Sequence, residues 1–212
     1  MKKILLALSV LAMCFTSCKK EVKIETEVSE MDTITTDEPM VEERMDSITE
    51  MKAWQAYMTP GDAHKMMAAE NGTWTNEMTF WHEPDNKPMK ATSTSECKMI
   101  LGDRYQEMNY KGTMMGMPFE GRSTLAYDNS TKEYISTWID NMGTGMLVMK
   151  GKYDPNTKTI EFKGDMVDPA RGKTIQCREL YTIVNDNTRK MEMYDIKNGA
   201  EHKNMEIIMK RK

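Results

Sequence analysis

The fold is decided by one turn sequence, Tyr127-Asp128-Asn129-Ser130-Thr131-Lys132, which returns almost literally as Tyr153-Asp154-Pro155-Asn156-Thr157-Lys158. A weaker third copy is Asn185-Asp186-Asn187-Thr188-Arg189. An Asp or Asn at the entry of such a turn hydrogen-bonds back to the chain, and proline presets the φ angle that a type I turn needs. Turns this short join antiparallel neighbours. The repeat therefore predicts that strands adjacent in sequence are adjacent in space.

Outward from these turns, everything after Gly72 has the pattern of β-strands. Short segments rich in Thr, Tyr, Trp and Ile alternate with Gly, Pro, Asn and Asp. The expected strands are about 73–82, 88–101, 103–112, 117–127, 132–140, 143–153, 157–164, 172–184, 188–196 and 202–210. Ten sequential antiparallel strands either close or leave two exposed edges. We therefore expect an all-β, ten-stranded, up-and-down barrel, with a β-sandwich as the alternative.

A short helical region precedes the strands. Apolar residues recur near helical spacing over about 44–58, at Met45, Ile48, Met51, Trp54 and Met58. A second helix is expected from Asp62 to Glu70, with Asp62 as its cap and Asn71-Gly72 at its end. These segments predict an N-terminal helix near one mouth of the barrel.

The first residues have the composition of an export signal. A basic start at Lys2-Lys3 is followed by an apolar run from Ile4 to Phe15 and then by Thr16-Ser17-Cys18. Ending on Cys after Ser resembles the lipobox of bacterial lipoproteins, although Phe15 stands where Leu is usual. The resemblance implies a signal peptide over 1–17 and an acylated, for example palmitate-bearing, Cys18 that anchors the mature chain to the bilayer. An ordinary cleaved signal is the alternative.

An acidic tether follows. Residues 19–50 contain eleven acids and four bases, which leaves a net charge of +1 for 51–212 out of the chain's total of −4. Such a charged, weakly apolar segment does not order itself and holds a domain away from the bilayer. We therefore expect a tether over 18–50 and a folded domain over 51–212, at the bacterial cell envelope. In a Gram-negative cell the outer membrane is favoured over the inner.

Several short motifs also point to a family. Gly72-Thr73-Trp74 is similar to the Gly-x-Trp start of lipocalin-like, or calycin, barrels. The whole stretch 60–212 resembles the bacterial domain of unknown function 1579 family, with Ala126 where a Gly is more usual. The pieces that carry this resemblance are Pro60-Gly61-Asp62-Ala63-His64, Phe80-Trp81-His82-Glu83-Pro84, Leu101-Gly102-Asp103-Arg104, Met114-Met115-Gly116-Met117-Pro118-Phe119-Glu120-Gly121, Ser136-Thr137-Trp138-Ile139-Asp140, Gly199-Ala200-Glu201 and Met205-Glu206-Ile207. The family implies a fold and no established activity.

Composition excludes some functions. With 29 Lys and Arg against 33 Asp and Glu, the chain lacks the basic balance of a nucleic-acid binder. No run of 18 apolar residues is present in the sequence. There is no Gly-x-Ser-x-Gly elbow, His-Glu-x-x-His, Gly-rich phosphate loop or Cys-x-x-Cys. Glu120 and Asp140 could form a carboxylate pair, but nothing in the sequence requires an enzyme.

Methionine is the anomaly of the composition. Of 24 methionines, 19 lie in 51–212, and on a strand Met191 with Met193, or Met205 with Met209, share a face. Thioethers suit Cu(I), and His82 or His202 beside a Met could ligate haem. Methionine is also the adaptable filler of cores and apolar pockets, and we favour that interpretation. No metal or cofactor is predicted.

The expected function is binding of a small hydrophobic or amphipathic ligand inside the barrel. Trp74 is expected in the core, and Arg104 and Arg178 as anchors for a carboxylate head. The candidate ligand-binding residues are Trp81, Arg104, Met115, Glu120, Trp138, Asp140, Met146, Met149, Arg178 and Met193. The alternatives are a barrel enzyme acting on such a ligand and an envelope interaction module with a filled barrel, whose protein partners the sequence does not identify. Cys97 and Cys177, on separate strands, are expected as two buried thiols.

Overall fold

The computed structural model describes residues 45–81 and 87–212. The expected signal peptide, the lipidation at Cys18 and most of the expected tether lie outside these residues, as does His82. The described part contains no helix that is both long and apolar enough to cross a membrane.

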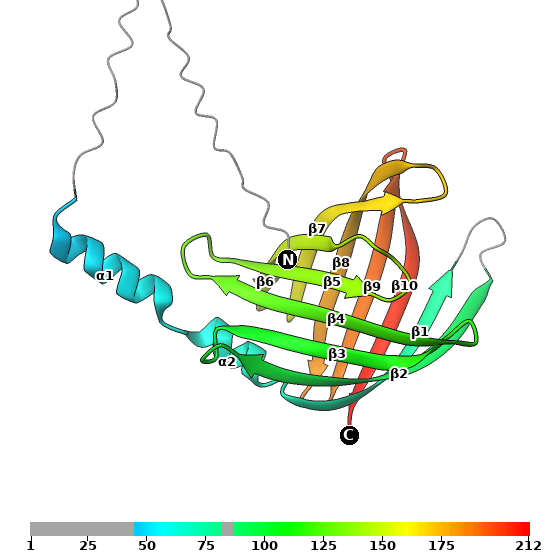
Figure 1. The fold of residues 1–212 in the computed structure, drawn as a ribbon, viewed down its shortest axis with the longest axis horizontal. Helices are drawn as coiled ribbons and strands as arrows, with labels where there is room; N and C mark the ends of the chain where they lie inside the picture. The colour runs from blue at the N-terminus through cyan, green and yellow to red at the C-terminus, as the bar shows by residue number, and fades with distance from the viewer. Residues whose placement is uncertain (1–44, 82–86) are drawn as a thin grey trace, which may run out of the picture. The chain divides into compact units, whose positions relative to one another are not determined.

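The strands form a closed antiparallel barrel of ten strands in sequence order, completed by pairing of the last strand with the first (Figure 1). This confirms the up-and-down barrel and removes the β-sandwich alternative. The strands are β1 Gly72–Trp81, β2 Pro88–Ile100, β3 Tyr105–Met114, β4 Met117–Asp128, β5 Glu133–Asp140, β6 Leu147–Asp154, β7 Thr159–Asp168, β8 Lys173–Asn185, β9 Thr188–Lys197 and β10 Ala200–Arg211.

The repeated turns have the predicted chemistry. Asp128 Oδ1 accepts hydrogen bonds from the amides of Ser130 and Thr131, at 2.7 and 3.2 Å. Asp154 Oδ1 accepts one from the Asn156 amide at 2.9 Å. Lys132 and Lys158, at the ends of the two turns, have φ of 59° and 54°. An Asx side chain that holds a tight turn explains why sequence order and spatial order agree.

Two helices precede the barrel, α1 Ser47–Met58 and α2 Asp62–Ala68. In the sequence, α1 begins inside the range expected for the tether. The second helix begins as predicted at Asp62, but its N-cap is Gly61, whose amide donates to His64 Nδ1 at 3.0 Å. Asp62 instead pairs with Lys65 at 2.8 Å. His64, in the first turn, therefore bonds back to the N-cap amide, whereas no side-chain cap of the kind expected from Asp62 is present at this helix.

Helix α1 has no buried residue, although its sequence carries large apolar side chains. Trp54, for example, is 57% exposed. The end of α1 is held by Asn129 in the β4–β5 turn, whose Nδ2 donates to the carbonyl oxygens of Tyr57 at 3.0 Å and Thr59 at 2.8 Å. One side chain of a repeated turn thus positions the helix.

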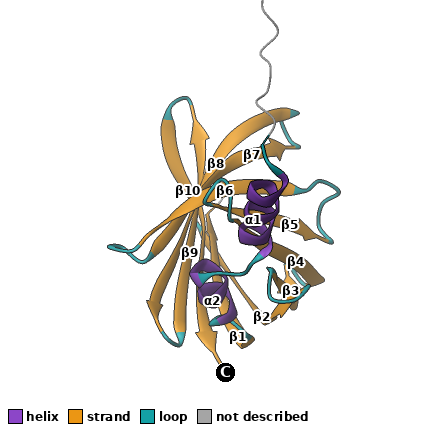
Figure 2. Ribbon diagram, turned by 90° about the vertical axis from the view of Figure 1, so that its left-hand side faces the viewer, coloured by secondary structure: helices purple, strands orange, loops and turns teal. Residues whose placement is uncertain are grey.

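Helix α2 lies at one end of the barrel (Figure 2) and contacts β2, β3 and β4. Met67 of this helix is 1% exposed and packs in a cluster with interior residues of the β5–β9 wall. A second cluster, around Trp74 and Met209, lies inside the β1–β4 wall and β10. Helix α2 therefore plugs the end of the barrel at which it lies, and that end is called the floor below.

Candidate functional site

The floor is sealed by a saturated polar network. The buried carboxylate of Glu70 accepts from Arg189 Nε at 2.8 Å and from the Tyr181 hydroxyl at 3.2 Å. The Trp74 indole donates to the Glu70 carbonyl at 2.9 Å, and the guanidinium groups of Arg189 and Arg211 lie over its ring at 5.2 and 4.3 Å. Each group has a partner inside the protein. The floor is therefore structural, and Trp74 belongs to the core as expected.

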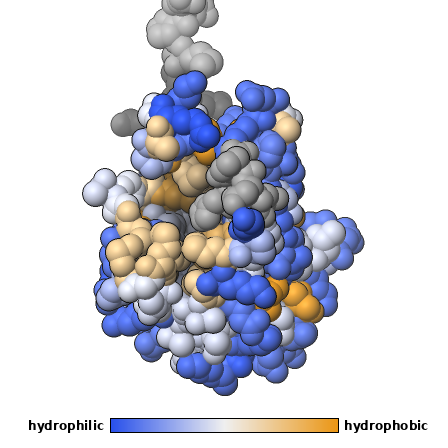
Figure 3. Space-filling view, turned by 90° about the vertical axis from the view of Figure 1, so that its right-hand side faces the viewer, coloured by the Kyte–Doolittle hydropathy of each residue, from blue (hydrophilic) through white to orange (hydrophobic). Residues whose placement is uncertain are grey.

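The opposite end, the mouth, is open. It is formed by the mouth hairpins, where β3 meets β4, β5 meets β6, β7 meets β8 and β9 meets β10, together with the end of β1. A cavity of about 1140 Å³ opens there. Its lining residues are Phe80, Trp81, Met166, Val167, Asp168, Pro169, Arg171, Ile175, Met193, Asp195, Lys197, Glu201, His202, Lys203, Asn204 and Met205. Figure 3 shows this face of the molecule, with a hollow bordered by apolar residues.

Hydrogen-bond acceptors lie in the inner wall of the mouth. Asp195 is buried, and its carboxylate accepts from Asn204 Nδ2 and pairs with Lys197 at 3.3 Å. The Oδ1 atom of Asn204 is buried and, among the described residues, has no hydrogen-bond partner. Asn204 sits at the irregularity where the β9–β10 register shifts, which turns its side chain toward the barrel wall. Lys203, next to it, places its Nζ 5.3 Å from the centre of the Trp81 ring.

The centre of the barrel holds a carboxyl group, that of Glu179 on β8. Its paired residues are Phe162 on β7 and Met193 on β9, two interior side chains, so Glu179 also faces inward. It remains half-buried rather than fully enclosed. Burial raises the pKa of Glu179 to about 7, with no cation close enough to oppose the shift. No other described residue donates a hydrogen bond to this carboxyl in the structure.

Other interior side chains at this depth also stay partly accessible. Trp138, Tyr181 and Met205 face inward yet are only half-buried. The Trp138 ring contacts Tyr110 edge-on at 5.1 Å and lies 2.5 Å from where a Cβ of Gly121 would stand. Only glycine at 121 leaves room for that indole. Residual accessibility of inward side chains indicates that the hollow extends from the mouth into the barrel.

The structure places the predicted ligand-binding residues in different environments. Trp81 and Met193 line the mouth cavity. Trp138 and Asp140 both face inward from β5, and Trp138 Nε1 donates a hydrogen bond to Asp140 Oδ2 at 2.6 Å. Met149 faces inward but is 2% exposed and packed in the core. Met193, Trp138, Asp140 and Met149 therefore face the interior, although they do not form one cluster. Trp81 follows the inward-facing Phe80 on β1, so it lies on the outer side of the mouth rim, beside Lys203.

The remaining predicted residues do not face the interior. Met115 and Met146 lie in mouth hairpins and are each 62% exposed. Glu120 points outward from β4, because its neighbours Phe119 and Gly121 face inward. Glu120 and Asp140 therefore lie on opposite faces of the sheet and do not form the carboxylate pair considered from the sequence.

The two arginines expected as interior anchors have other roles. Arg104 lies in the β2–β3 turn at the floor end and donates to the carbonyls of Leu101 at 3.4 Å and Gly102 at 3.0 Å. Arg178 points outward from β8, where it makes two hydrogen bonds to Glu201, at 2.7 and 2.6 Å. The alternation of β8 puts Glu179, not Arg178, inside. Glu179 was not among the predicted site residues, although Cys177 and Tyr181, two residues before and after it, indicate the inward face of this strand.

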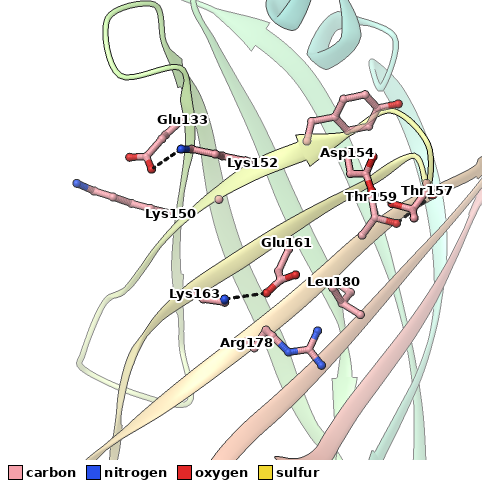
Figure 4. Close-up of a pocket in the computed structure, with 12 residues that line it drawn as sticks. Glu133, Lys150, Lys152, Asp154, Thr157, Thr159, Glu161, Lys163, Arg178 and Leu180 are labelled. Carbon is pink, nitrogen blue, oxygen red and sulfur yellow. Dashed lines mark hydrogen bonds and ion pairs between the residues drawn. The ribbon is translucent and has the colours of Figure 1, made fainter.

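The outer surface of β5–β8 has a shallow groove of about 730 Å³ (Figure 4). Its charges alternate in sign: Lys163 pairs with Glu161 at 3.0 Å and Lys152 with Glu133 at 3.9 Å. Such exposed ion pairs contribute little to stability. Because positive and negative side chains alternate, the groove has no concentration of one charge that would attract a charged ligand. The groove is therefore a weaker candidate than the interior.

Cys97 and Cys177 are buried thiols on β2 and β8, as expected. Burial raises the pKa of the Cys97 thiol to about 12 and that of Cys177 to about 11. No three His, Cys, Asp or Glu side chains within 45–81 and 87–212 gather as a metal site.

Taken together, the fold defines a closed antiparallel β-barrel with one plugged end and one open end. The chain belongs to the family described as "Protein of unknown function (DUF1579)", which matches residues 59–211. The barrel is also similar to the crystal structure of Rv2717c from M. tuberculosis, with a TM-score of 0.51 and 9% sequence identity over 73% of this chain and 99% of that one. At that identity the similarity concerns the fold alone. A comparison with curated proteins finds no match.

Proposed function

We propose that this protein binds a small hydrophobic or amphipathic molecule inside its barrel, through the open mouth. The observation that carries the proposal is the asymmetry of the two ends. One end is closed by α2 and the Glu70–Arg189 network, while the other opens into a cavity of about 1140 Å³. Pockets for small ligands have volumes of roughly 300–1,000 Å³ and are concave and mostly apolar, with a few polar groups.

The chemistry of the lining supports an apolar ligand. Phe80, Met166, Ile175, Met193 and Met205 contribute to the cavity wall. Methionine side chains are flexible and polarizable, so a wall that contains several of them adapts to ligands of irregular shape. The resemblance of Gly72-Thr73-Trp74 to the start of lipocalin-like barrels agrees with this proposal.

We propose that the protein is located at the bacterial cell envelope and is anchored to the membrane through acylated Cys18. The support is the sequence of residues 1–18 and the acidic segment that follows. Stable anchoring requires two acyl chains or an equivalent second signal. Mass spectrometry of the N-terminal peptide from membrane fractions tests this part: a diacylated Cys18 supports it, and an unmodified peptide starting elsewhere contradicts it.

Uptake of the neutral fluorophore N-phenyl-1-naphthylamine tests the binding proposal. We expect a saturable rise in fluorescence with the wild-type protein and a loss of it in Met205→Trp, because the indole fills the cavity. Val148→Trp is the matched control, since Val148 faces outward on β6 and is 45% exposed. Equal fluorescence from the two tryptophan variants, or none from a folded wild type, would contradict binding inside the barrel.

A further inference from the structure

Glu179 is an acid that the fold does not need for stability. Transfer of a carboxylate into a protein interior is costly unless a cation or hydrogen-bond donors compensate it. The other interior acids have such partners: Glu70 has Arg189 and Tyr181, and Asp195 has Asn204 and Lys197. Glu179 is the exception among the described interior acids.

The groups facing Glu179 are neutral or acidic. On its own strand these are Cys177 and Tyr181, on β7 Phe162, on β9 Met193 and Asp195, and across the barrel Tyr110 of β3. Burial first, and the charge of Glu179 second, raise the pKa of the Tyr110 phenol. Toward the mouth, the carboxylate of Asp195 and the unpartnered Oδ1 of Asn204 add two further acceptors. The cations of the mouth, Arg171, Lys197 and Lys203, pair with Asp168, Asp195 and Glu192. The surroundings of Glu179 thus offer hydrogen-bond acceptors and one acid that no described cation neutralises.

Aromatic rings complete the environment. Trp138 and Tyr181 pack against the interior cluster that contains Tyr110, and Tyr110 and Trp138 are in edge-to-face contact at 5.1 Å. Cations are attracted to the faces of aromatic rings, most strongly where water is excluded. A carboxylate among aromatic rings and thioethers is therefore suited to an organic cation rather than to a fatty acid.

We propose that the ligand of this barrel carries a cationic amine or quaternary ammonium head, which pairs with Glu179, and an apolar portion that extends past Met193 and Met205 to the mouth. This inference rests on the proposed function, and it names the chemical class of the ligand. It replaces the carboxylate head that the sequence analysis assigned to Arg104 and Arg178, since both arginines lie outside the cavity.

Three amphiphiles with ten-carbon chains and heads of different charge test the inference: decyltrimethylammonium, decanol and decanoate. Each is titrated at pH 8 against the protein loaded with N-phenyl-1-naphthylamine, and the displacement constants are compared. We expect the order cation, then alcohol, then carboxylate. In Glu179→Gln the affinity for the cation falls by about tenfold or more, because the opposite charge that attracts the ammonium head inside the barrel is lost, while that for decanol changes by less than about threefold.

Glu96→Gln is the matched control, because Glu96 is exposed on the outer face of β2. The control retains the wild-type order of affinities, and circular dichroism verifies that both variants are folded. Binding of decanol with no preference for the cation, or a preference that survives in Glu179→Gln, overturns the inference and leaves the proposed function standing. A folded wild-type protein that binds neither the fluorophore nor any amphiphile overturns both.

Discussion

Removal of the Glu179 charge is expected to stabilise the free protein above neutral pH. In the folded barrel burial raises the pKa of Glu179 from an ordinary value of 4.5 to about 7. The folded state therefore keeps a proton on this carboxyl between those two pH values, while the unfolded chain has released it. Because the unfolded state then binds fewer protons, stability falls as pH rises through this window.

The magnitude follows from the size of the shift. At 1.36 kcal/mol for each pKa unit, ionised Glu179 costs the folded state about 3 kcal/mol above pH 7. Glu179→Gln has nearly the same shape and no titration. We expect the variant and the wild type to have the same free energy of unfolding near pH 4. Between about pH 4.5 and 7 the variant becomes increasingly more stable than wild type, and above pH 7 the difference stays constant.

Urea denaturation of the ligand-free protein at pH 4, 6 and 8 measures this difference. Glu96→Gln, on the outer face, should stay within about 0.5 kcal/mol of wild type at each pH. The reasoning is refuted if Glu179→Gln is no more stable than wild type at pH 8. It is equally refuted if any advantage of the variant is the same at pH 4 as at pH 8, because only titration of Glu179 makes it depend on pH.

Three further predictions concern the floor, helix α1 and the thiols. Arg189→Met leaves Glu70 buried without its cation, and we expect a loss of about 3–5 kcal/mol in urea denaturation, part of which the double variant with Glu70→Gln recovers; a loss below 1 kcal/mol would contradict the network. Asn129→Ala removes the hydrogen bonds to the end of α1, so amide exchange over 47–58 should accelerate while the barrel strands exchange as before; unchanged exchange in α1 would show that other contacts hold it. Cys97 and Cys177 should resist iodoacetamide at pH 8 in the folded protein and react in urea, as followed by peptide mass spectrometry, because burial raises both pKa values; rapid labelling without urea would contradict their burial.

The barrel could be predicted from the sequence because its determinants are local. An Asp at each turn entry hydrogen-bonds to amides two or three residues away, so the repeat of the turn is visible without knowledge of the rest of the fold. The alternation of strand residues likewise placed Met191 and Met193 on one face, and both pack against the interior clusters. Closure of the barrel then followed from the number of sequential strands.

The site was harder to predict, because it depends on strand bounds and long-range partners. The third strand was expected from residue 103 but begins at Tyr105, so Arg104 lies in the preceding turn. On β8 the side chains alternate so that Arg178 faces outward and Glu179 faces inward. The partner of Glu70 is Arg189, 119 residues away in the sequence. The sequence around either residue therefore does not predict which end of the barrel is sealed. No local pattern distinguishes a paired buried acid from an unpaired one.

Native mass spectrometry of the protein purified without denaturation tests the central claim, an interior cavity that holds a ligand, most directly. We predict a reproducible added mass on the wild-type protein and on Val148→Trp that leaves on unfolding and is missing from Met205→Trp. That mass should correspond to an organic amine or ammonium compound. An added mass that Met205→Trp retains would place the molecule outside the barrel, and ligand-free masses that persist after incubation with decyltrimethylammonium and decanol would contradict the account.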